Sequence, residues 1–298
     1  MAWVRDLDKD EIRSGFLVSA HRKHIWETEL ELLAELDRVC QKYGLLYYVD
    51  GGTLLGAVRH QGFIPWDDDI DVVMFRKDYE RLKDVGADEF TGNLFFQTAY
   101  TDNALFNMAK IRNSKTMGLE YYDRKDFNQG IFLDIFPFDD ISDGSEEQNQ
   151  LFAWRQELYV MALMPEVYKE AEDAQVVFAI PENERRAVMS MSAVERFRIY
   201  EEFQREHTGE SGIVTYMPYE FTHRYKEHFK RTIFEKVVQL KFEGRTVPAP
   251  VEYDRLLKIY FGDYHTPVKF AADHGNNILF SADVSYKEYQ AVQQVNQI

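Results

Sequence analysis

The sequence predicts an α/β protein with a mixed sheet core that is flanked by helices. Two observations lead to this class. Helical patterns alternate with short apolar runs up to about residue 140, and long, charged, proline-poor stretches follow. We therefore expect a core over residues 1–140, a helical insertion over 141–220, and a C-terminal segment over 221–298 that completes the core.

The first elements follow from the spacing of apolar residues. From 25 to 43 they recur with the period of an amphipathic helix, and Gly44 supplies its end. The run 45–49 predicts a buried strand that leads into Asp50-Gly51-Gly52, and Thr53 starts one or two helical turns that reach His60. Further strands are expected over 70–75, 95–98, 106–111 and 131–136. A helix over 76–85 should follow the first of them, and Pro137 should close the last.

The second half of the chain reads differently. Residues 145–164 and 182–206 predict long surface helices, and β-branched residues return between 229 and 247. A compact helix is expected over 251–260 and ends at Gly262. The stretch after Asn276 predicts no particular element.

Composition excludes several classes of protein. The 298 residues carry 35 Lys and Arg against 51 Asp and Glu, a net charge of −16, which would repel nucleic acid. The single cysteine, Cys40, excludes an internal disulfide and a cysteine-based zinc cluster. The N-terminus has no signal-peptide pattern, and no window has the ~20 apolar residues of a membrane span. We expect a cytoplasmic protein that binds no nucleic acid.

The most informative stretch is Trp66-Asp67-Asp68-Asp69-Ile70-Asp71. Side chains alternate along a strand, so Asp69 and Asp71 would share one face of the strand over 70–75. Two carboxylates aimed at one spot repel each other unless a cation neutralises them. Oxygen ligands suit Mg²⁺ or Mn²⁺. The alternatives are a solvated acidic loop and a DxD-type glycosyltransferase; an EF-hand is excluded because Val72 replaces its turn glycine.

A third acid, Asp134, lies alone in the apolar run Ile131-Phe132-Leu133-Asp134-Ile135-Phe136. Burying an unpaired carboxylate is costly, which favours a partner cation. A salt bridge to Lys110 or Arg112 is the structural alternative.

Gly51, Gly52 and Thr53 would let backbone N–H groups approach a phosphate at the start of a helix. Together with Asp69, Asp71 and Asp134, this turn is the pattern of the polymerase-β-like nucleotidyltransferase superfamily. The sequence thus predicts a nucleotidyltransferase-like core with these three acids as catalytic and metal-binding residues.

The stretch from Asp50 to Asp71 closely resembles the LicD family, which includes fukutin-related proteins. The stretches 128–137, 242–245 and 260–264 resemble later blocks of that family, so that the likeness spans residues 24 to 270 and leaves 145–219 unmatched. The resemblance implies a phosphotransferase that moves phosphocholine from CDP-choline to a hydroxyl of a cell-surface glycan precursor such as teichoic acid, lipopolysaccharide or capsule.

Roles follow from this resemblance and from the needs of phosphoryl transfer. Asp69, Asp71 and Asp134 would hold Mg²⁺ or Mn²⁺, and Asp134 would take the proton of the acceptor. Substrate-binding roles are expected for a further group, namely Gly51, Gly52, Thr53, Arg59, Lys110, Arg112, Asp67 and Asp68. Arg59 would clamp a phosphate, with a surface salt bridge as its alternative.

Other hypotheses remain open at this point. The transferred group could be glycerol phosphate or ribitol phosphate, the reaction could be nucleotidyl transfer to a small molecule, or the protein could be an inactive binding protein. A basic stretch around Phe221, Tyr225, Phe229 and Ile233 suggests either contact with a lipid-linked glycan acceptor at the inner membrane surface or a plain helix face. Trp66, Tyr121 and Tyr122 could cage a trimethylammonium group, or could be core residues.

Overall fold

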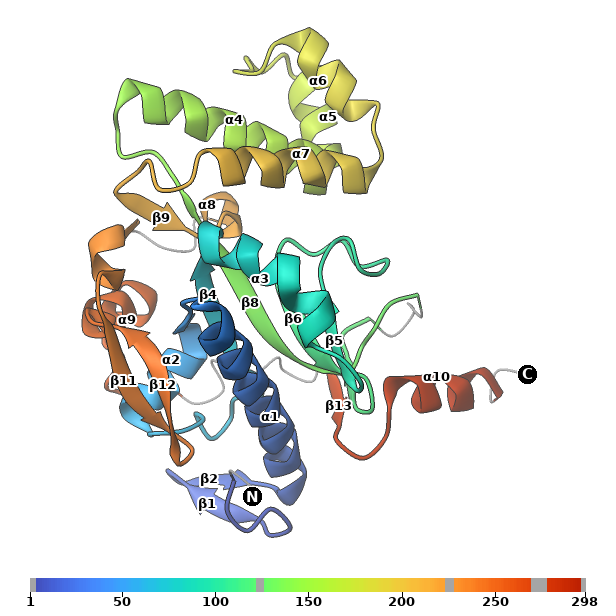
Figure 1. Ribbon diagram of the computed structural model, residues 1–298, viewed down its shortest axis with the longest axis vertical. Coiled ribbons are helices and arrows are strands. Elements are labelled where there is room, and N and C mark those ends of the chain that lie inside the picture. Colours follow the sequence, from blue (N-terminus) through green and yellow to red (C-terminus); the bar gives the residue numbers. More distant parts are fainter. Residues whose placement is uncertain (1–3, 122–125, 223–227, 269–277, 296–298) are drawn as a thin grey trace. The chain divides into compact units, whose positions relative to one another are not determined.

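A computed structural model describes residues 4–121, 126–222, 228–268 and 278–295. The chain divides into two compact units (Figure 1). Unit 1 is discontinuous and consists of Met1–Ala104, Met108–Pro137 and Ile233–Ile298, and unit 2 consists of Leu105–Asn107 and Phe138–Thr232. The predicted mixed α/β class is confirmed.

Unit 1 begins with a hairpin and the longest helix of the described chain. The hairpin, β1 (Glu11–Arg13) and β2 (Phe16–Val18), was not predicted. Helix α1 (Ala20–Tyr43) starts five residues before the predicted one because the Ser19 hydroxyl accepts a hydrogen bond from the Arg22 N–H and caps it. Gly44 ends the helix in the left-handed region, as predicted (φ 63°).

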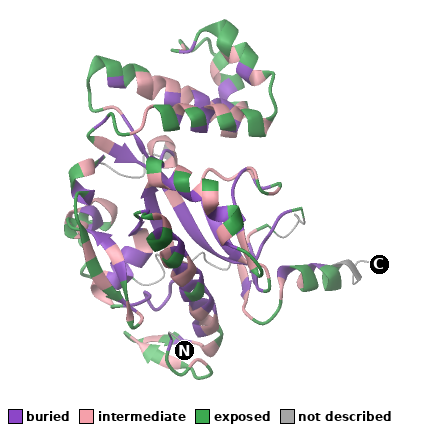
Figure 2. Ribbon diagram, in the orientation of Figure 1, coloured by how far each residue is buried: buried purple, intermediate pink, exposed green. Residues whose placement is uncertain are grey.

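The sheet of unit 1 follows the predicted runs. Its neighbouring strands are, in order, β3 (Tyr48–Val49), β4 (Asp71–Phe75), β8 (Ile131–Asp140), β6 (Ala109–Asn113) and β5 (Leu94–Gln97). Helix α2 (Gly51–Arg59) connects β3 to β4, and α3 (Arg76–Glu89) follows β4. Figure 2 shows that the strands are largely buried, so the sheet is the centre of the core.

Strand β8 does not end at Pro137, and this prediction was wrong. The strand pairs with β6 up to Ile135 and with the next partner, β9 (Ile213–Thr215), from Asp139 onward. Pro137 falls between these two ladders, where no backbone N–H is needed, so the residue that lacks one is accommodated.

The C-terminal segment contributes further elements to unit 1. Strands β11 (Val237–Phe242) and β12 (Arg245–Pro250) form a hairpin, and α9 (Tyr253–Phe261) ends at Gly262 as predicted. Beyond Asn276, β13 (Leu279–Ser281) pairs with β7 (Met117–Leu119), and α10 (Tyr286–Val295) follows. Phe280 of β13 packs in a core cluster with Ile25, Ile131 and Phe132.

Unit 2 is mainly helical. Helix α4 (Glu146–Leu163) confirms the first predicted helix, and α5 (Pro165–Asp173) follows it. The second predicted helix is two helices, α6 (Glu182–Met189) and α7 (Ala193–Glu206), because Ser192 and Glu195 form a capping box that starts a new one. Trp154 and Phe203 stack between α4 and α7.

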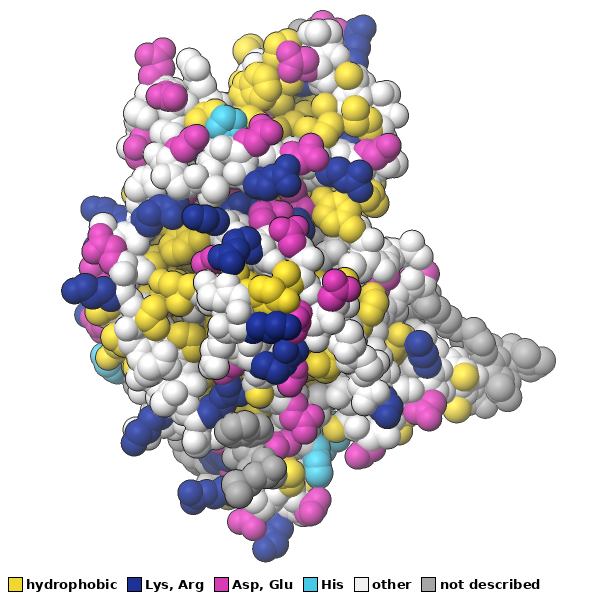
Figure 3. Space-filling view, in the orientation of Figure 1, with side chains coloured by type: hydrophobic (Ala, Val, Ile, Leu, Met, Phe, Trp, Pro, Cys, Tyr) yellow, Lys and Arg dark blue, Asp and Glu magenta, His cyan; other side chains and the backbone are white. Residues whose placement is uncertain are grey.

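The basic stretch does not form one helix in the described residues. Helix α8 (Pro218–Thr222) is short, and Phe229 lies in strand β10 (Phe229–Lys230), where it pairs with Val214. A 3₁₀ turn (Arg231–Phe234) follows and buries Ile233. The helix-face interpretation therefore fails for Phe229 and Ile233. Residues 223–227, which include Tyr225, lie outside the described residues. On the face in Figure 3, acidic and basic side chains are interspersed.

Candidate active site

The glycine turn lies against the acidic run. Helix α2 starts at Gly51, whose φ of 50° is in the left-handed region. A Cβ on Gly52 would stand 2.6 Å from Oδ2 of Asp67, and one on Gly51 would stand 3.5 Å from Oδ2 of Asp71. Thr53 holds the two segments together, because its hydroxyl accepts a hydrogen bond from the Asp71 N–H (2.9 Å). The turn thus leaves room for carboxylates.

Asp67, Asp68 and Asp69 bring carboxylate oxygens together within 4.8 Å of one another. Asp67 is only 2% exposed, and its Oδ1 has no hydrogen-bond partner among the described residues. Burial, followed by the charges of Asp71 and Asp68, raises the pKa of Asp67 well above its ordinary value, while a hydrogen bond with Asp69 opposes this. A buried oxygen without a partner in an all-oxygen donor set fits a hard divalent cation.

Asp134 lies on the strand beside this run. Figure 1 shows β8 next to β4 and running in the same direction, and the Asp134 N–H donates to the carbonyl of Ile70 (3.1 Å). In a parallel pair this bond sets Asp134 beside Asp71, with both side chains on one face of the sheet. Its carboxylate is paired with the ammonium of Lys110 at 2.9 Å. Asp71 and Asp134 stand outside the group of oxygens that Asp67, Asp68 and Asp69 form.

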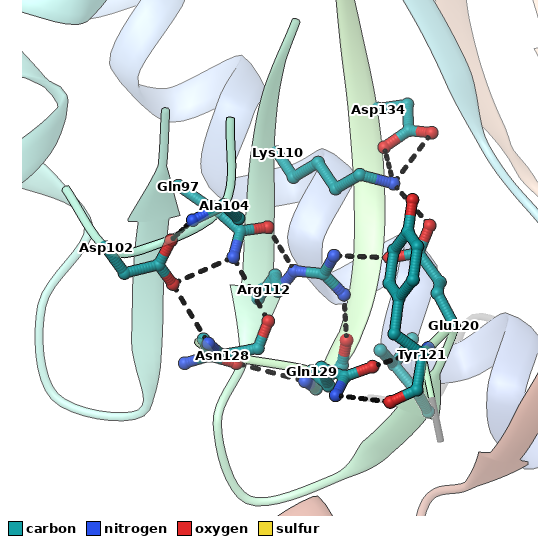
Figure 4. A network of polar contacts seen from close by, with 12 residues as sticks. Gln97, Asp102, Ala104, Lys110, Arg112, Glu120, Tyr121, Asn128, Gln129 and Asp134 are labelled. Carbon is teal, nitrogen blue, oxygen red and sulfur yellow. Dashed lines mark hydrogen bonds and ion pairs between the residues drawn. The ribbon is translucent and has the colours of Figure 1, made fainter. Parts of the chain in front are cut away.

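Lys110 and Arg112 are buried on β6 and held by the protein itself (Figure 4). Arg112 donates to Gln97 (2.6 Å), to the carbonyl of Gly130 (2.9 Å) and to Glu120 (2.5 Å). Lys110 donates to Glu120 (3.1 Å) as well as to Asp134. The structural alternative raised for Asp134, a salt bridge to Lys110, is therefore present.

Glu120 is the residue of this network that the sequence reasoning missed. Burial acts to raise its pKa, but the charges of Lys110 and Arg112 outweigh burial and bring the pKa to about 2. Burial likewise raises the pKa of Asp134, and the charge of Lys110 opposes the change. The sequence offered Asp134 as the salt-bridge partner of Lys110 or Arg112, and no pattern pointed to Glu120.

Arg59 lies at the other end of α2 from the glycine turn. Its Nη1 donates to the carbonyl of Tyr264 (2.9 Å), and burial lowers its pKa. It lines a cavity of about 550 Å³ together with Arg5, Arg13 and His60, among others. At 1.5 Å per helical residue, α2 separates Arg59 from the glycine turn by about 12 Å. The structure therefore places Arg59 in a neighbouring cavity.

The aromatic residues have separate surroundings. Trp66 is 1% exposed and packs edge-on against Phe16 and His60, so it is a core residue. Tyr121 is 42% exposed and contacts Phe127, and Tyr122 lies outside the described residues. Trp66 therefore has no exposed face with which to cage a cation.

Two buried acids near the turn had not been singled out. Asp50 accepts hydrogen bonds from the Tyr260 hydroxyl of α9 at both carboxylate oxygens (2.8 and 2.9 Å). Glu29 of α1 is 1% exposed, and its Oε2 has no hydrogen-bond partner among the described residues. A signal for Glu29 was available, because it interrupts the apolar face of the predicted helix between Trp26 and Leu33.

The chain is similar in sequence to known proteins. The sequence model of the LicD/FKTN/FKRP nucleotidyltransferase domain matches residues 44–183. Over 240 residues the chain is 29% identical to the lipopolysaccharide cholinephosphotransferase LicD of Haemophilus influenzae. The aligned region covers 79% of this chain and 88% of that protein. It is 45% identical over 40 residues to the ribitol 5-phosphate transferase FKRP of Homo sapiens, 13% of this chain and 8% of that protein.

The matched residues 44–183 include the glycine turn, the acidic run and Asp134, and the match to the Haemophilus protein extends well beyond them. Over these stretches the chain is similar to proteins of the LicD family.

Proposed function

We propose that this protein transfers an alcohol phosphate from a CDP-activated donor to a hydroxyl of a cell-surface glycan precursor. The alcohol phosphate that we propose is phosphocholine. The relatives support the class of reaction, because one is named a cholinephosphotransferase and another a ribitol 5-phosphate transferase. In this reaction the acceptor oxygen forms a bond to the transferred phosphorus, the bond from that phosphorus to the CMP oxygen breaks, and the hydroxyl proton goes to a base.

The observation that carries the proposal is the gathering of carboxylates at the glycine turn. Asp67, Asp68 and Asp69 share one group of oxygens, Asp71 lies against Gly51, and Asp134 is the neighbour of Asp71 on β8. An anionic donor would be repelled from these acids unless Mg²⁺ or Mn²⁺ were bound. A divalent cation held by Asp69, Asp71 and neighbouring carboxylates would supply the charge that draws in the diphosphate of the donor and stabilises the transfer of the alcohol phosphate away from CMP.

The protein's own groups have separate tasks in this proposal. The N–H groups at the start of α2 orient a phosphate oxygen, and Gly51 and Gly52 permit its close approach. The Asp134 carboxylate accepts the proton of the acceptor hydroxyl. Lys110, which is hydrogen-bonded to Asp134, keeps that carboxylate in place and offsets its charge.

The direct test is to incubate the protein with Mg²⁺, a glycan precursor extract and each of CDP-choline, CDP-ethanolamine, CDP-glycerol and CDP-ribitol, and to measure CMP release. We expect CMP from CDP-choline and phosphocholine on the glycan. An Asp69→Asn variant should release none, whereas Asp88→Asn, a change of an exposed acid on α3, should behave like the wild type. If only another CDP-alcohol released CMP, the alcohol phosphate of that donor would be the transferred group in place of phosphocholine.

Nucleotidyl transfer is the alternative that the same acids could serve. Release of pyrophosphate from a nucleoside triphosphate, without CMP release from any CDP-alcohol, would show that alternative and overturn the proposal. No helix in the described ranges has the length and hydropathy to cross a membrane. We place the reaction in the cytoplasm, with the lipid-linked glycan acceptor met at the inner face of the membrane.

A further inference from the structure

Helix α1 directs one stripe of side chains at the acidic run. Arg22, Trp26 and Glu29 follow one another at spacings of four and three residues, which places them on one face of the helix. The guanidinium of Arg22 donates to the carbonyl of Asp67 (2.6 Å), and so does the indole N–H of Trp26 (2.9 Å). The helix face that carries Glu29 is therefore the face that holds the acidic run.

Glu29 is buried in a way that calls for a partner. It is 1% exposed, and within the described part of the chain its Oε2 has no hydrogen-bond partner. Asp67, which lies against the same face of α1, also has a buried oxygen without one. Burial and the charges of Asp69, Asp68 and Asp67 raise the pKa of Glu29 well above its usual value. Glu29 stands outside the group of oxygens that Asp67, Asp68 and Asp69 form, but Glu29 and Asp67 each bury an oxygen without a partner where α1 meets the acidic run. A cation bound there would satisfy both oxygens.

We propose that Glu29 is a further carboxylate of the divalent-cation site at Asp67, Asp68 and Asp69, contributed by α1 from outside the acidic run. This assignment rests on the proposed function only for the use made of the cation, because the binding of the cation can be measured alone. The row of Arg22, Trp26 and Glu29 then has one purpose. Arg22 and Trp26 fix the backbone at Asp67 through hydrogen bonds, and Glu29 adds a carboxylate from the same helix face.

The experiment compares Glu29→Gln with Glu31→Gln, a matched change of an exposed residue on the same helix. Glutamine keeps the shape of the side chain and removes its charge. Mn²⁺ alone is titrated into each protein and the free ion is followed by electron paramagnetic resonance. We expect the affinity of Glu29→Gln for Mn²⁺ to fall at least about tenfold, while Glu31→Gln matches the wild type.

Thermal melts give a second readout that a merely structural role would not produce. Without metal, Glu29→Gln should melt at a higher temperature than the wild type, because a buried acid beside three others has been neutralised. With saturating Mn²⁺, its rise in melting temperature should be smaller than that of the wild type. If Glu29→Gln instead melts below the wild type without metal, and Mn²⁺ raises both melting temperatures equally, Glu29 only packs the helix.

Each remaining outcome is decisive. Equal Mn²⁺ affinity in Glu29→Gln and the wild type, or no binding of Mn²⁺ to the wild type, overturns the assignment of Glu29. A tenfold loss of Mn²⁺ affinity in a protein that releases CMP from none of the four donors supports the assignment and refutes the proposed function.

Discussion

Glu120 is expected to stabilise unit 1 through its contacts with two buried, positively charged side chains, and Glu120→Gln tests this. The carboxylate receives hydrogen bonds from Lys110 and Arg112, which are 1% and 0% exposed (Figure 4). Its pKa is about 2 instead of 4.5. At about 1.4 kcal/mol for each tenfold change in proton affinity, this difference corresponds to about 3 kcal/mol of folding free energy at neutral pH.

The pH dependence gives the sign of the effect. A carboxylate whose pKa is lower in the folded protein than in the unfolded chain stabilises the fold above the unfolded value. For Glu120 that contribution is complete above about pH 4.5 and is lost as the pH falls towards 2. Glu120→Gln should therefore be less stable than the wild type by about 3 kcal/mol at pH 7, and the two proteins should converge below pH 3.

Urea unfolding followed by tryptophan fluorescence measures this difference. Glu35→Gln serves as the control, because Glu35 pairs with Arg38 at 2.8 Å on the exposed surface of α1, where such pairs contribute about 0–1 kcal/mol. A loss below about 1 kcal/mol in Glu120→Gln at pH 7 would refute the reasoning. So would a loss that stays constant down to pH 3.

Three further outcomes are expected. Asp71→Ala should reduce transfer at least about 100-fold while the protein melts near the wild-type temperature, and retained CMP release would exclude Asp71 from the site. Gly52→Ala should weaken Mn²⁺ binding and lower the melting temperature, because the new Cβ would stand 2.6 Å from the carboxylate of buried Asp67; normal binding would contradict the tight fit. Tyr260→Phe should cost about 1.5–3 kcal/mol in urea unfolding through loss of its hydrogen bond to Asp50, and an unchanged midpoint would contradict this.

Elements whose stability is encoded locally could be predicted from the sequence. The apolar period of α1 and the end at Gly44 are local signals, and so are the runs that became β4 and β5. The strand after Ile131 was predicted to stop at Pro137, because the rule for proline concerns a missing hydrogen bond and the sequence does not show which partner a given N–H would face. The ladder switch along β8 is a property of the tertiary structure.

The candidate site divides in the same way. The glycine turn and the acidic run are close in sequence, and the structure brings Gly52 against Asp67. The interruption of the apolar face of α1 points to Glu29, but its contact with the acidic run depends on how α1 packs. The contribution of Glu120 depends on how the residues after β7 pack, and no sequence pattern identifies it. The role of Arg59 stays a prediction: its nearness in sequence to the glycine turn suggested a shared ligand, and the structure places the two at opposite ends of the nine-residue helix α2.

The pairing of β13 with β7 has a consequence for biosynthesis. Leu279, Phe280 and Ser281 supply the partner of Met117, Gly118 and Leu119, directly before Glu120. A ribosome makes β7 long before it makes β13, so the nascent chain carries an open strand edge while the segment Phe138–Thr232 of unit 2 is being synthesised. Chains released before Leu279 would keep that edge available to other molecules, and we expect them to aggregate even though every carboxylate of the candidate site is already present.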